Sequence, residues 1–258
     1  MAEGGFWTER LRRFGHTGWA DPVIYAYDQR LRLRALVELL GVGAQQRRAL
    51  DFGCGVGDFS ALLAQRFAAV VAHDISDEVL QRAQRLVSAA NVSWTRDRER
   101  ALGAGPFDLV LSITVLQHVT DDVELARLVQ GFAAALAPQG RVILLESTGA
   151  QDSAPAAYIR LRTAAQLVRA FEAAGLALRR QQAFHHPIDN PTSGFARYRT
   201  RLDVRLLGRL AAAGLGWAAR RLASLAERAV AQDSDALRAG PGPTQFMVFG
   251  HRGEVAHG

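Results

Sequence analysis

A carboxylate and three closely spaced glycines stand near position 50, a pattern that suits the binding of a small charged ligand. Residues 49–58 read Ala-Leu-Asp-Phe-Gly-Cys-Gly-Val-Gly-Asp, and their apolar start predicts a buried strand. Glycine permits positive φ and lets a ligand approach the backbone closely. A carboxylate at Asp51 would repel a pyrophosphate but attract an ammonium group. A dinucleotide fingerprint, G-x-G-x-x-G, would need a glycine where Asp58 stands, which argues against a nicotinamide cofactor.

The same stretch resembles the first motif, D-x-G-x-G-x-G, of the class I S-adenosylmethionine (SAM)-dependent methyltransferases. The resemblance covers residues 30–184 and the last strand, and it implies that SAM is the cofactor. Cys54 is interpreted as a small residue that fits the turn. The residues of the turn assigned to the cofactor are Asp51, Gly53, Cys54, Gly55 and Gly57.

A second carboxylate, Asp74, ends the apolar run that begins at Val70 and stands 23 residues after Asp51. This is close to the spacing of the acidic residue that binds a ribose in an α/β unit. One carboxylate can accept from two neighbouring hydroxyls. We predict that Asp74, with Ile75 beside it, contacts the ribose of SAM. The alternative is a solvated loop aspartate.

Further cofactor contacts follow from the resemblance. In the family, an Asp after the third strand commonly accepts from the adenine amino group, and the next backbone N–H serves a ring nitrogen. Asp97 and Arg98 match these positions, although the charged run 96–100 is also typical of an exposed loop. Ser112, at the end of the fourth predicted strand, completes the predicted cofactor set.

The exit of the fourth strand, Ser112-Ile-Thr-Val115, argues against a nucleic-acid acceptor. It lacks the Asn/Asp-Pro-Pro-Tyr clamp with which related amino-methylating DNA enzymes hold a flipped base. It also lacks the nucleophilic Cys that the cytosine C5 enzymes carry after this strand. We predict a small-molecule acceptor and no nucleic acid, although the chain has a net charge of +6.

Histidines that follow strands are the candidate bases. Methyl transfer from a sulfonium is an in-line displacement, so alignment supplies much of the acceleration. A positioned His would help an alcohol, a phenol or a carbonyl-flanked carbon, whereas a carboxylate needs no base. The candidate catalytic residues are His118, after the fourth strand, and His186, after the sixth. Helix capping by His118 and a loop pair His185-His186 without function are the alternatives.

Aromatic and basic residues outside the predicted core are candidates for acceptor contacts. Aromatic side chains in 14–27 would either close a pocket against water or pin the segment to the core. All 31 cationic side chains are Arg, whose planar fork suits a carboxylate or phosphate on the substrate. The predicted substrate residues are His16, Trp19, Tyr25, Tyr27, Tyr158, His185, Arg197, Tyr198 and Arg199.

Strand and helix patterns alternate along most of the chain. Strands are predicted at 48–52, 69–74, 92–96, 107–112, 141–146, 176–184 and 244–250. Helices are predicted at 30–40, 58–67, 76–89, 121–136, 163–174, 200–213 and 216–232, with a turn at 138–140. This predicts an α/β fold with a Rossmann-like, doubly wound seven-stranded sheet, mostly parallel with an antiparallel last strand.

The connection between strands six and seven, about sixty residues long, exceeds an ordinary loop and predicts a helical lid insert. The predicted organisation is an N-terminal cap segment at 1–29, a SAM-binding core at 30–184, the lid insert at 185–243, and the last core strand and tail at 244–258.

The composition predicts a soluble, cytoplasmic protein. The 258 residues are 49% apolar, enough for one large core, and the N-terminus lacks the apolar run of a signal peptide. The lone cysteine suits a reducing compartment. We expect a monomer or homodimer with no metal site and no membrane binding, because the apolar stripe at 216–232 is more typical of a core or dimer contact.

These observations predict a SAM-dependent methyltransferase that acts on a hydroxyl or carboxylate oxygen of a small, acidic metabolite. The alternatives are N- or C-methylation, or a SAM-binding protein of the same fold with other chemistry, such as cyclisation. A non-catalytic partner protein of this fold is a further alternative. The intact turn with Asp51 and Asp74 argues against it, because a pure scaffold has no physical need for them.

Overall fold

The computed structural model describes residues 4–41, 46–184, 194–231, 237–239 and 242–253. The chain divides into two compact units. The first unit comprises residues 1–8, 43–184 and 239–258, and the second comprises residues 9–42 and 185–238. All the residues predicted to bind the cofactor belong to the first unit.

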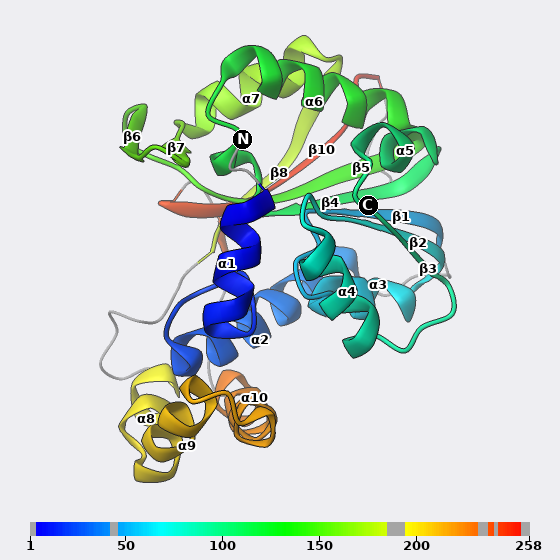
Figure 1. Cartoon of the computed structure of the whole chain (residues 1–258). Helices are drawn as coiled ribbons and strands as arrows, with labels where there is room; N and C mark the ends of the chain where they lie inside the picture. Colours follow the sequence, from blue (N-terminus) through cyan, green and yellow to red (C-terminus); the bar gives the residue numbers. More distant parts are fainter. Residues whose placement is uncertain (1–3, 42–45, 185–193, 232–236, 240–241, 254–258) are drawn as a thin grey trace. The chain divides into compact units, whose positions relative to one another are not determined.

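A mixed β-sheet forms the centre of the first unit (Figure 1). Its strands are β1 (Gln46–Phe52), β2 (Phe67–His73), β3 (Val92–Thr95), β4 (Phe107–Ile113), β5 (Leu136–Ser147), β8 (Leu176–Phe184), β9 (Leu237–Ala239) and β10 (Thr244–His251), in the order β3-β2-β1-β4-β5-β10-β8-β9. The first five pair in parallel, whereas β10 is antiparallel to both β5 and β8. This confirms the predicted seven-stranded sheet with an antiparallel last strand, to which β9 adds a short edge.

Helices cover both faces of this sheet. The helices α5 (Arg98–Gly103), α6 (Asp122–Ala135) and α7 (Ala164–Ala173) lie on one face, and α3 (Asp58–Ala64) and α4 (Asp77–Leu86) lie on the other (Figure 1). Leu50, Val110 and Val142 of three neighbouring strands belong to one buried cluster with Phe132 of α6 and Phe171 of α7. Burial of these apolar side chains holds the helices against the sheet.

The order of the strands reverses between β1 and β4. The chain continues from β1 to β2 and β3 on one side of the sheet, and then to β4 and β5 on the other. Ligands of such sheets bind beyond the carboxyl ends of the strands at this point. The glycine turn 53–57 follows β1, and the 3₁₀ turn η1 (Leu116–His118) closely follows β4. Because Phe52 pairs with Ser112, the two exits lie side by side.

Several short elements differ from the sequence prediction. The predicted turn at 138–140 lies inside β5, where pairing jumps from Phe107↔Leu136 to Leu109↔Arg141, so that these residues form an irregularity within the strand. The hairpin of β6 (Ser153–Ala156) and β7 (Ile159–Leu161) was not predicted, because runs of three or four residues are too short to show a periodicity. The helix α1 (Gly4–Phe14) was also missed.

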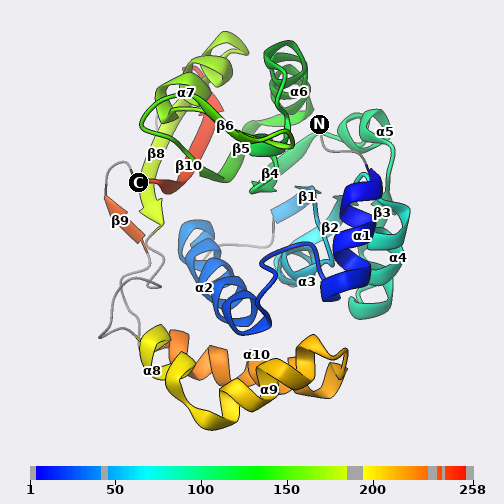
Figure 2. The ribbon, with the colours of Figure 1, turned by 60° about the vertical axis from the view of Figure 1, so that its left-hand side comes forward.

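The second unit is helical. Its α10 (Gly216–Val230) contacts α2 (Pro22–Leu40), α8 (Gly194–Thr200) and α9 (Leu202–Ala212) (Figure 2). The helices α9 and α10 match the two predicted in the insert, and α8 is additional. The helix that contains residues 30–40, which we placed in the 30–184 core, groups with these helices. The role of residues 185–243 as a lid stays a prediction.

Removal of a core ring tests this packing. Phe171 is fully buried and stacks on Phe249, with ring centroids 4.2 Å apart. We expect Phe171→Ala to lower the free energy of unfolding of the first unit by about 3–5 kcal/mol, measured by urea denaturation followed by circular dichroism. The control is Val123→Ala on α6, where the side chain is 59% exposed and a change within about 0.5 kcal/mol is expected. Equal effects of the two substitutions would contradict the assignment of Phe171 to the core.

Candidate functional site

The turn after β1 is fixed by backbone hydrogen bonds to the end of β2. The N–H groups of Gly53 and Cys54 both donate to the carbonyl of His73, each at 2.8 Å. Gly53, Gly55 and Gly57 have φ values of 79°, 54° and 90°, in the left-handed region that favours glycine. The three glycines therefore give the turn a shape that other residues adopt only under strain.

Two of these glycines are also required by packing within the protein. A Cβ at Gly53 would overlap the side chain of Val115, and a Cβ at Gly57 would lie 2.8 Å from Val87 Cγ2. The turn is thus packed against the exit of β4 and the end of α4. Cys54 is buried, and burial raises the pKa of its thiol, which supports its interpretation as a small packing residue.

Asp51 lies near the end of β1 with only 1% of its surface exposed. Its Oδ2 accepts a hydrogen bond from Ser60 Oγ of α3 at 2.6 Å. Burial raises the pKa of Asp51 to about 7, and the carboxylates of Asp74 and Asp58 act in the same direction. An ammonium group beside Asp51 would counteract this effect, because it favours the charged carboxylate.

Asp74 directly follows β2 and is buried. Its Oδ2 accepts from the N–H of Gly55 at 3.0 Å, and its Oδ1 accepts from the N–H of Ser76 at 3.1 Å. Burial raises the pKa of this carboxyl to about 6. Each oxygen offers a second lone pair, so Asp74 can hold the glycine turn and still accept from two hydroxyls. The neighbouring Ile75 is half-buried.

Asp97 and Arg98 both have structural partners. Asp97 is exposed and caps α5, since its Oδ1 accepts from the N–H of Arg100 at 3.1 Å. Arg98 forms ion pairs with Glu124 and Glu99. The adenine contacts of these two residues stay predictions.

The end of β4 combines an unpartnered hydroxyl with a strained backbone. The Oγ of Ser112 is buried and has no hydrogen-bond partner in the part of the chain that the structure describes. Thr114 has a φ of 56°, which is uncommon for a β-branched residue and occurs mainly where the surroundings enforce it. Its N–H donates to the carbonyl of Leu145 at 2.6 Å, and this bond helps to hold the strained residue.

A buried carboxylate on β5 holds the start of η1. Glu146, with 1% of its surface exposed, accepts through Oε1 from the N–H groups of Val115 and Leu116, at 2.9 and 2.8 Å. Its Oε2 accepts from the N–H of Gln117 at 3.1 Å. The sequence prediction of the site missed Glu146, although a carboxylate that ends an apolar strand is the signal that would have found it.

His118 is buried at the end of η1, and the orientation of its ring is defined by hydrogen bonds. Its Nδ1 donates to the backbone carbonyl of Tyr158 at 2.9 Å, because a carbonyl oxygen can only accept. The proton of the neutral ring then resides on Nδ1, and Nε2 accepts from the side-chain amide of Gln117 at 3.3 Å. This is the arrangement of a base whose reactive nitrogen is Nε2.

One aromatic ring of α1 contacts this histidine, and a second contacts Tyr158. The ring of Trp7 meets that of His118 edge to face, with centroids 4.8 Å apart. The ring centroids of Phe6 and Tyr158 are 4.5 Å apart. The Oγ1 of Thr8 is 2.8 Å from Ser76 Oγ, which places the start of α1 beside the exit of β2. The sequence prediction placed the aromatic cap at 14–27 and overlooked Phe6 and Trp7. The adjacent pair of aromatic residues was the available signal.

The other predicted substrate residues belong to the second unit. His16 stacks on Tyr25, with centroids 3.4 Å apart, and burial lowers the pKa of His16 to about 4. Trp19 is exposed and its Nε1 donates to Asp28 at 3.0 Å. Tyr27 and Tyr198 lie in the interior of the second unit, whereas Arg197 and Arg199 are exposed. His185 and His186 lie outside the described residues.

Two further features concern metals and membranes. Within the described ranges, no group of three or more His, Cys, Asp or Glu side chains is placed to hold a metal ion. Among the helices that the structure describes, none is both long and apolar enough to cross a membrane.

Comparison with known proteins identifies the family. The family model described as a methyltransferase domain matches residues 25–181, which is more than half of the chain. This chain belongs to the methyltransferase domain family. The matched range includes the glycine turn, Asp74 and His118, and it ends within β8.

Curated relatives of this methyltransferase domain match over a shorter range. A ubiquinone biosynthesis O-methyltransferase of Caulobacter sp. (strain K31) is 35% identical over 102 residues, which cover 38% of this chain and 39% of the relative. A trans-aconitate 2-methyltransferase of Pseudomonas paraeruginosa is 36% identical over 115 residues, which cover 43% of this chain and 41% of the relative. The chain thus spans less than half the length of these relatives.

Solved structures resemble the methyltransferase domain in fold. A SAM-dependent methyltransferase of Leishmania major superposes with a TM-score of 0.56 at 17% identity, covering 72% of this chain and 78% of that chain. The cyclase SpnF superposes with a TM-score of 0.55 at 18% identity, covering 86% of this chain and 81% of that chain. These likenesses confirm the Rossmann-like fold.

The burial of Asp51 predicts a pH-dependent stability. Its folded pKa of about 7 lies above the ordinary value of 3.8 for an aspartate, so the folded state binds the proton more tightly and loses stability as the pH rises between these pKa values. Asp51→Asn carries no charge at any of these pH values. We expect its free energy of unfolding to exceed that of the native protein by an amount that grows as the pH rises from 4 to 7, up to about 4 kcal/mol. Urea denaturation at several pH values measures this gain.

The matched control for Asp51→Asn is Glu172→Gln, which neutralises an exposed carboxylate on α7. The pH-dependent gain should be confined to Asp51→Asn. An equal gain in both variants, or no gain in Asp51→Asn, would contradict the assignment of the effect to the burial of Asp51.

Proposed function

We propose that this protein is a SAM-dependent methyltransferase that acts on an oxygen atom of a small molecule. The observation that carries the proposal is the position of His118. Its Nδ1 is held by the carbonyl of Tyr158, and Val115, the residue before η1, packs against the glycine turn. A base with a defined tautomer is thus placed at the switch point of the sheet, where α/β proteins bind their ligands.

The residues around the switch point fit SAM. The buried Asp51 suits an ammonium group, Asp74 has lone pairs for two hydroxyls, and the buried Oγ of Ser112 still has a hydrogen-bond position to fill. Gly55, with a φ of 54°, has no side chain to obstruct a ligand that approaches the backbone of the turn. When bound, SAM supplies an electrophilic methyl group on a sulfonium.

His118 would accept the proton of an acceptor hydroxyl at Nε2 as the methyl group is transferred. The acceptor hydroxyl would take the position of the Gln117 amide, which occupies Nε2 here. Nδ1–H would keep its bond to the Tyr158 carbonyl and hold the ring in place. The rings of Trp7 and Phe6 would exclude water from the reacting oxygen.

The acceptor is proposed to be a hydroxyl rather than a carboxylate, because an ionised carboxylate has no proton for the oriented base to remove. The names of the two curated relatives, an O-methyltransferase and a methyltransferase of trans-aconitate, agree with a small-molecule acceptor. For an acidic group on the acceptor, the exposed Arg197 and Arg199 stay the candidates. A screen of metabolites for a gain of 14 Da in mass with SAM tests the proposal. A converted product of unchanged mass would indicate other SAM-dependent chemistry.

Removal of Asp74 tests the placement of the cofactor. Asp74→Ala should weaken SAM binding by about 2–3 kcal/mol, a loss of roughly 30- to 150-fold in affinity, because two hydroxyls lose a charged acceptor. Isothermal titration calorimetry measures this loss. The control is Asp77→Ala, three residues further on, where the side chain is exposed and pairs with Arg96. Equal affinity of Asp74→Ala and the native protein would show that the ribose binds elsewhere.

Removal of His118 tests the chemistry. His118→Gln should lower kcat by about 10²- to 10⁴-fold, because the variant has no base. Its affinity for SAM should stay within about twofold of the native value, since His118 is assigned to the acceptor. Product mass against time gives kcat, and calorimetry gives the affinity. Full turnover by His118→Gln on a hydroxyl acceptor would refute the role of His118 as a base.

A further inference from the structure

We propose that Arg160 of β7 and Arg162, which directly follows β7, are positioning residues for His118. Together they form a clamp, here called the arginine clamp, that keeps the proton of the His118 ring on Nδ1. The inference deepens the proposed function and rests on it for the catalytic consequence. The hydrogen bonds that carry the inference are those of the first unit and require neither SAM nor an acceptor.

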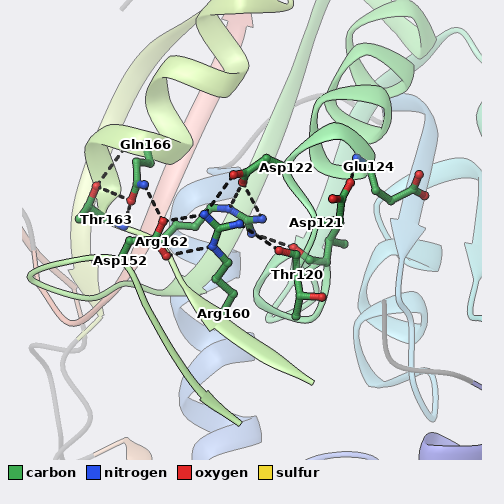
Figure 3. A network of polar contacts seen from close by, with 10 residues as sticks. Thr120, Asp121, Asp122, Glu124, Asp152, Arg160, Arg162, Thr163 and Gln166 are labelled. Atoms are coloured by element: carbon green, nitrogen blue, oxygen red, sulfur yellow. Dashed lines mark hydrogen bonds and ion pairs between the residues drawn. The ribbon is translucent and has the colours of Figure 1, made fainter. Parts of the chain in front are cut away.

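Arg162 holds the chain directly after His118. The side chain of Arg162 is 3% exposed, and its Nη1 donates to the carbonyl of Val119 at 2.8 Å (Figure 3 shows the surrounding network). Its Nε donates to Asp122 Oδ1 at 3.0 Å. Its Nη2 lies 3.0 Å from the same Asp122 Oδ1 as an ion pair without hydrogen-bond geometry. Because a buried guanidinium is costly without such partners, Val119 and Asp122 fix the position of Arg162. The residue after His118 is thus bonded to the residue that directly follows β7.

Arg160, like Arg162, contacts both the backbone after His118 and the side chain of Asp122 (Figure 3). Its Nη1 donates to the carbonyl of Thr120 at 3.0 Å, and its Nη2 forms an ion pair with Asp122 at 3.0 Å. The two carboxylate oxygens of Asp152 accept from Nε and Nη2 at 2.9 and 2.7 Å. Such bidentate geometry defines the orientation of both side chains.

The clamp is anchored on two helices. Asp122 belongs to the first turn of α6. Asp152 also accepts from Gln166 Nε2 at 2.8 Å, and Gln166 forms a capping box with Thr163 at the start of α7. The clamp therefore joins β7 to elements that are packed in the core of the first unit.

The residues of the arginine clamp lie close in sequence to both partners of the His118 hydrogen bond. Val119 and Thr120 directly follow His118, and Arg160 and Arg162 follow Tyr158 by two and four residues. The clamp therefore spans the two segments that meet in the hydrogen bond between His118 Nδ1 and the Tyr158 carbonyl. Which nitrogen of a neutral imidazole carries the proton depends on the bond that the other makes. Separation of the segments would release Nδ1 and allow the proton to reside on Nε2, the nitrogen that the proposed mechanism needs as a base.

The tautomer of His118 tests this directly. The full chain labelled with ¹⁵N-histidine reports the protonated nitrogen of each neutral ring by NMR, and the His118 signals are assigned by their loss in His118→Gln. We expect the Nδ1–H tautomer in the native protein. In Arg162→Gln the ratio of Nδ1–H to Nε2–H should fall by about fivefold or more, the effect of one weakened hydrogen bond. An unchanged ratio in a folded Arg162→Gln would overturn the proposal, as would an Nε2–H tautomer in the native protein.

Two further variants keep the test decisive. Arg160→Gln removes the bond to Thr120 from a side chain that is 24% exposed, so it carries the same test with a smaller shift if Arg162→Gln does not fold. Arg201→Gln breaks an exposed bidentate pair with Asp203 in the second unit and is the matched control. The control should leave the His118 tautomer unchanged, and an equal shift there would contradict a specific clamp.

Kinetics then separates the clamp from the proposed function. If both hold, kcat falls in proportion to the fraction of His118 that remains in the Nδ1–H tautomer, while the KM for SAM stays within about twofold. A clearly lower fraction of the Nδ1–H tautomer with an unchanged kcat would support the clamp and refute the role of His118 as the base. A fall in kcat with an unchanged tautomer would refute the clamp alone.

Discussion

The parallel pairing of β1 with β4 is the constraint on which the site depends. Phe52 pairs with Ser112, so the glycine turn and η1 leave the sheet side by side. Val115 then fills the space that a side chain at Gly53 would occupy, and this contact locks the two exits together. A slip of one residue in this register would turn the side chains of β4 to the opposite face of the sheet and remove His118 from the turn. Because helices cover both faces of the sheet, such a slip would also disrupt the packing of the buried β4 side chains against both layers.

Three buried carboxylates fix the segments that leave the sheet at the candidate site. Asp51, Asp74 and Glu146 lie at the ends of three strands, and each is held by hydroxyl or backbone N–H donors. Burial of a charge is costly unless donors surround it, so each of these side chains determines the position of the loop that supplies its donors. Glu146 sets η1, and Asp74 joins the glycine turn to the start of α4. The aromatic side chains of α1 and the arginine clamp complete the surroundings of His118 from distant parts of the sequence.

The sequence predicted the repeating elements well and the short ones poorly. The strand at 176–184 and the helices at 163–174 and 216–232 match the structure within two residues, because their periodicity extends over many positions. The β6–β7 hairpin and α8 carry too few residues for a periodic signal. The predicted substrate contacts of Tyr27 and Tyr198 rested on residue type alone, and the structure places both rings in the interior of the second unit. The residue type shows that a side chain is aromatic. Only the packing of the folded chain decides whether that side chain faces a core or a ligand.

The sequence by itself determined the class of fold, the glycine turn with Asp51, and the carboxylate at Asp74, because these depend on local spacing along a few strands. It also indicated His118, since the residue closely follows a predicted strand. The tertiary structure decided the tautomer of His118, the partners of Glu146 and the pairing of Arg160 and Arg162 with Asp122. Each of these joins residues thirty to forty positions apart, and a hydrogen bond depends on atoms within about 3 Å rather than on distance along the chain. Local pattern therefore gives the strands and the glycine turn of the candidate site, and the packing of the sheet decides which side chains meet there.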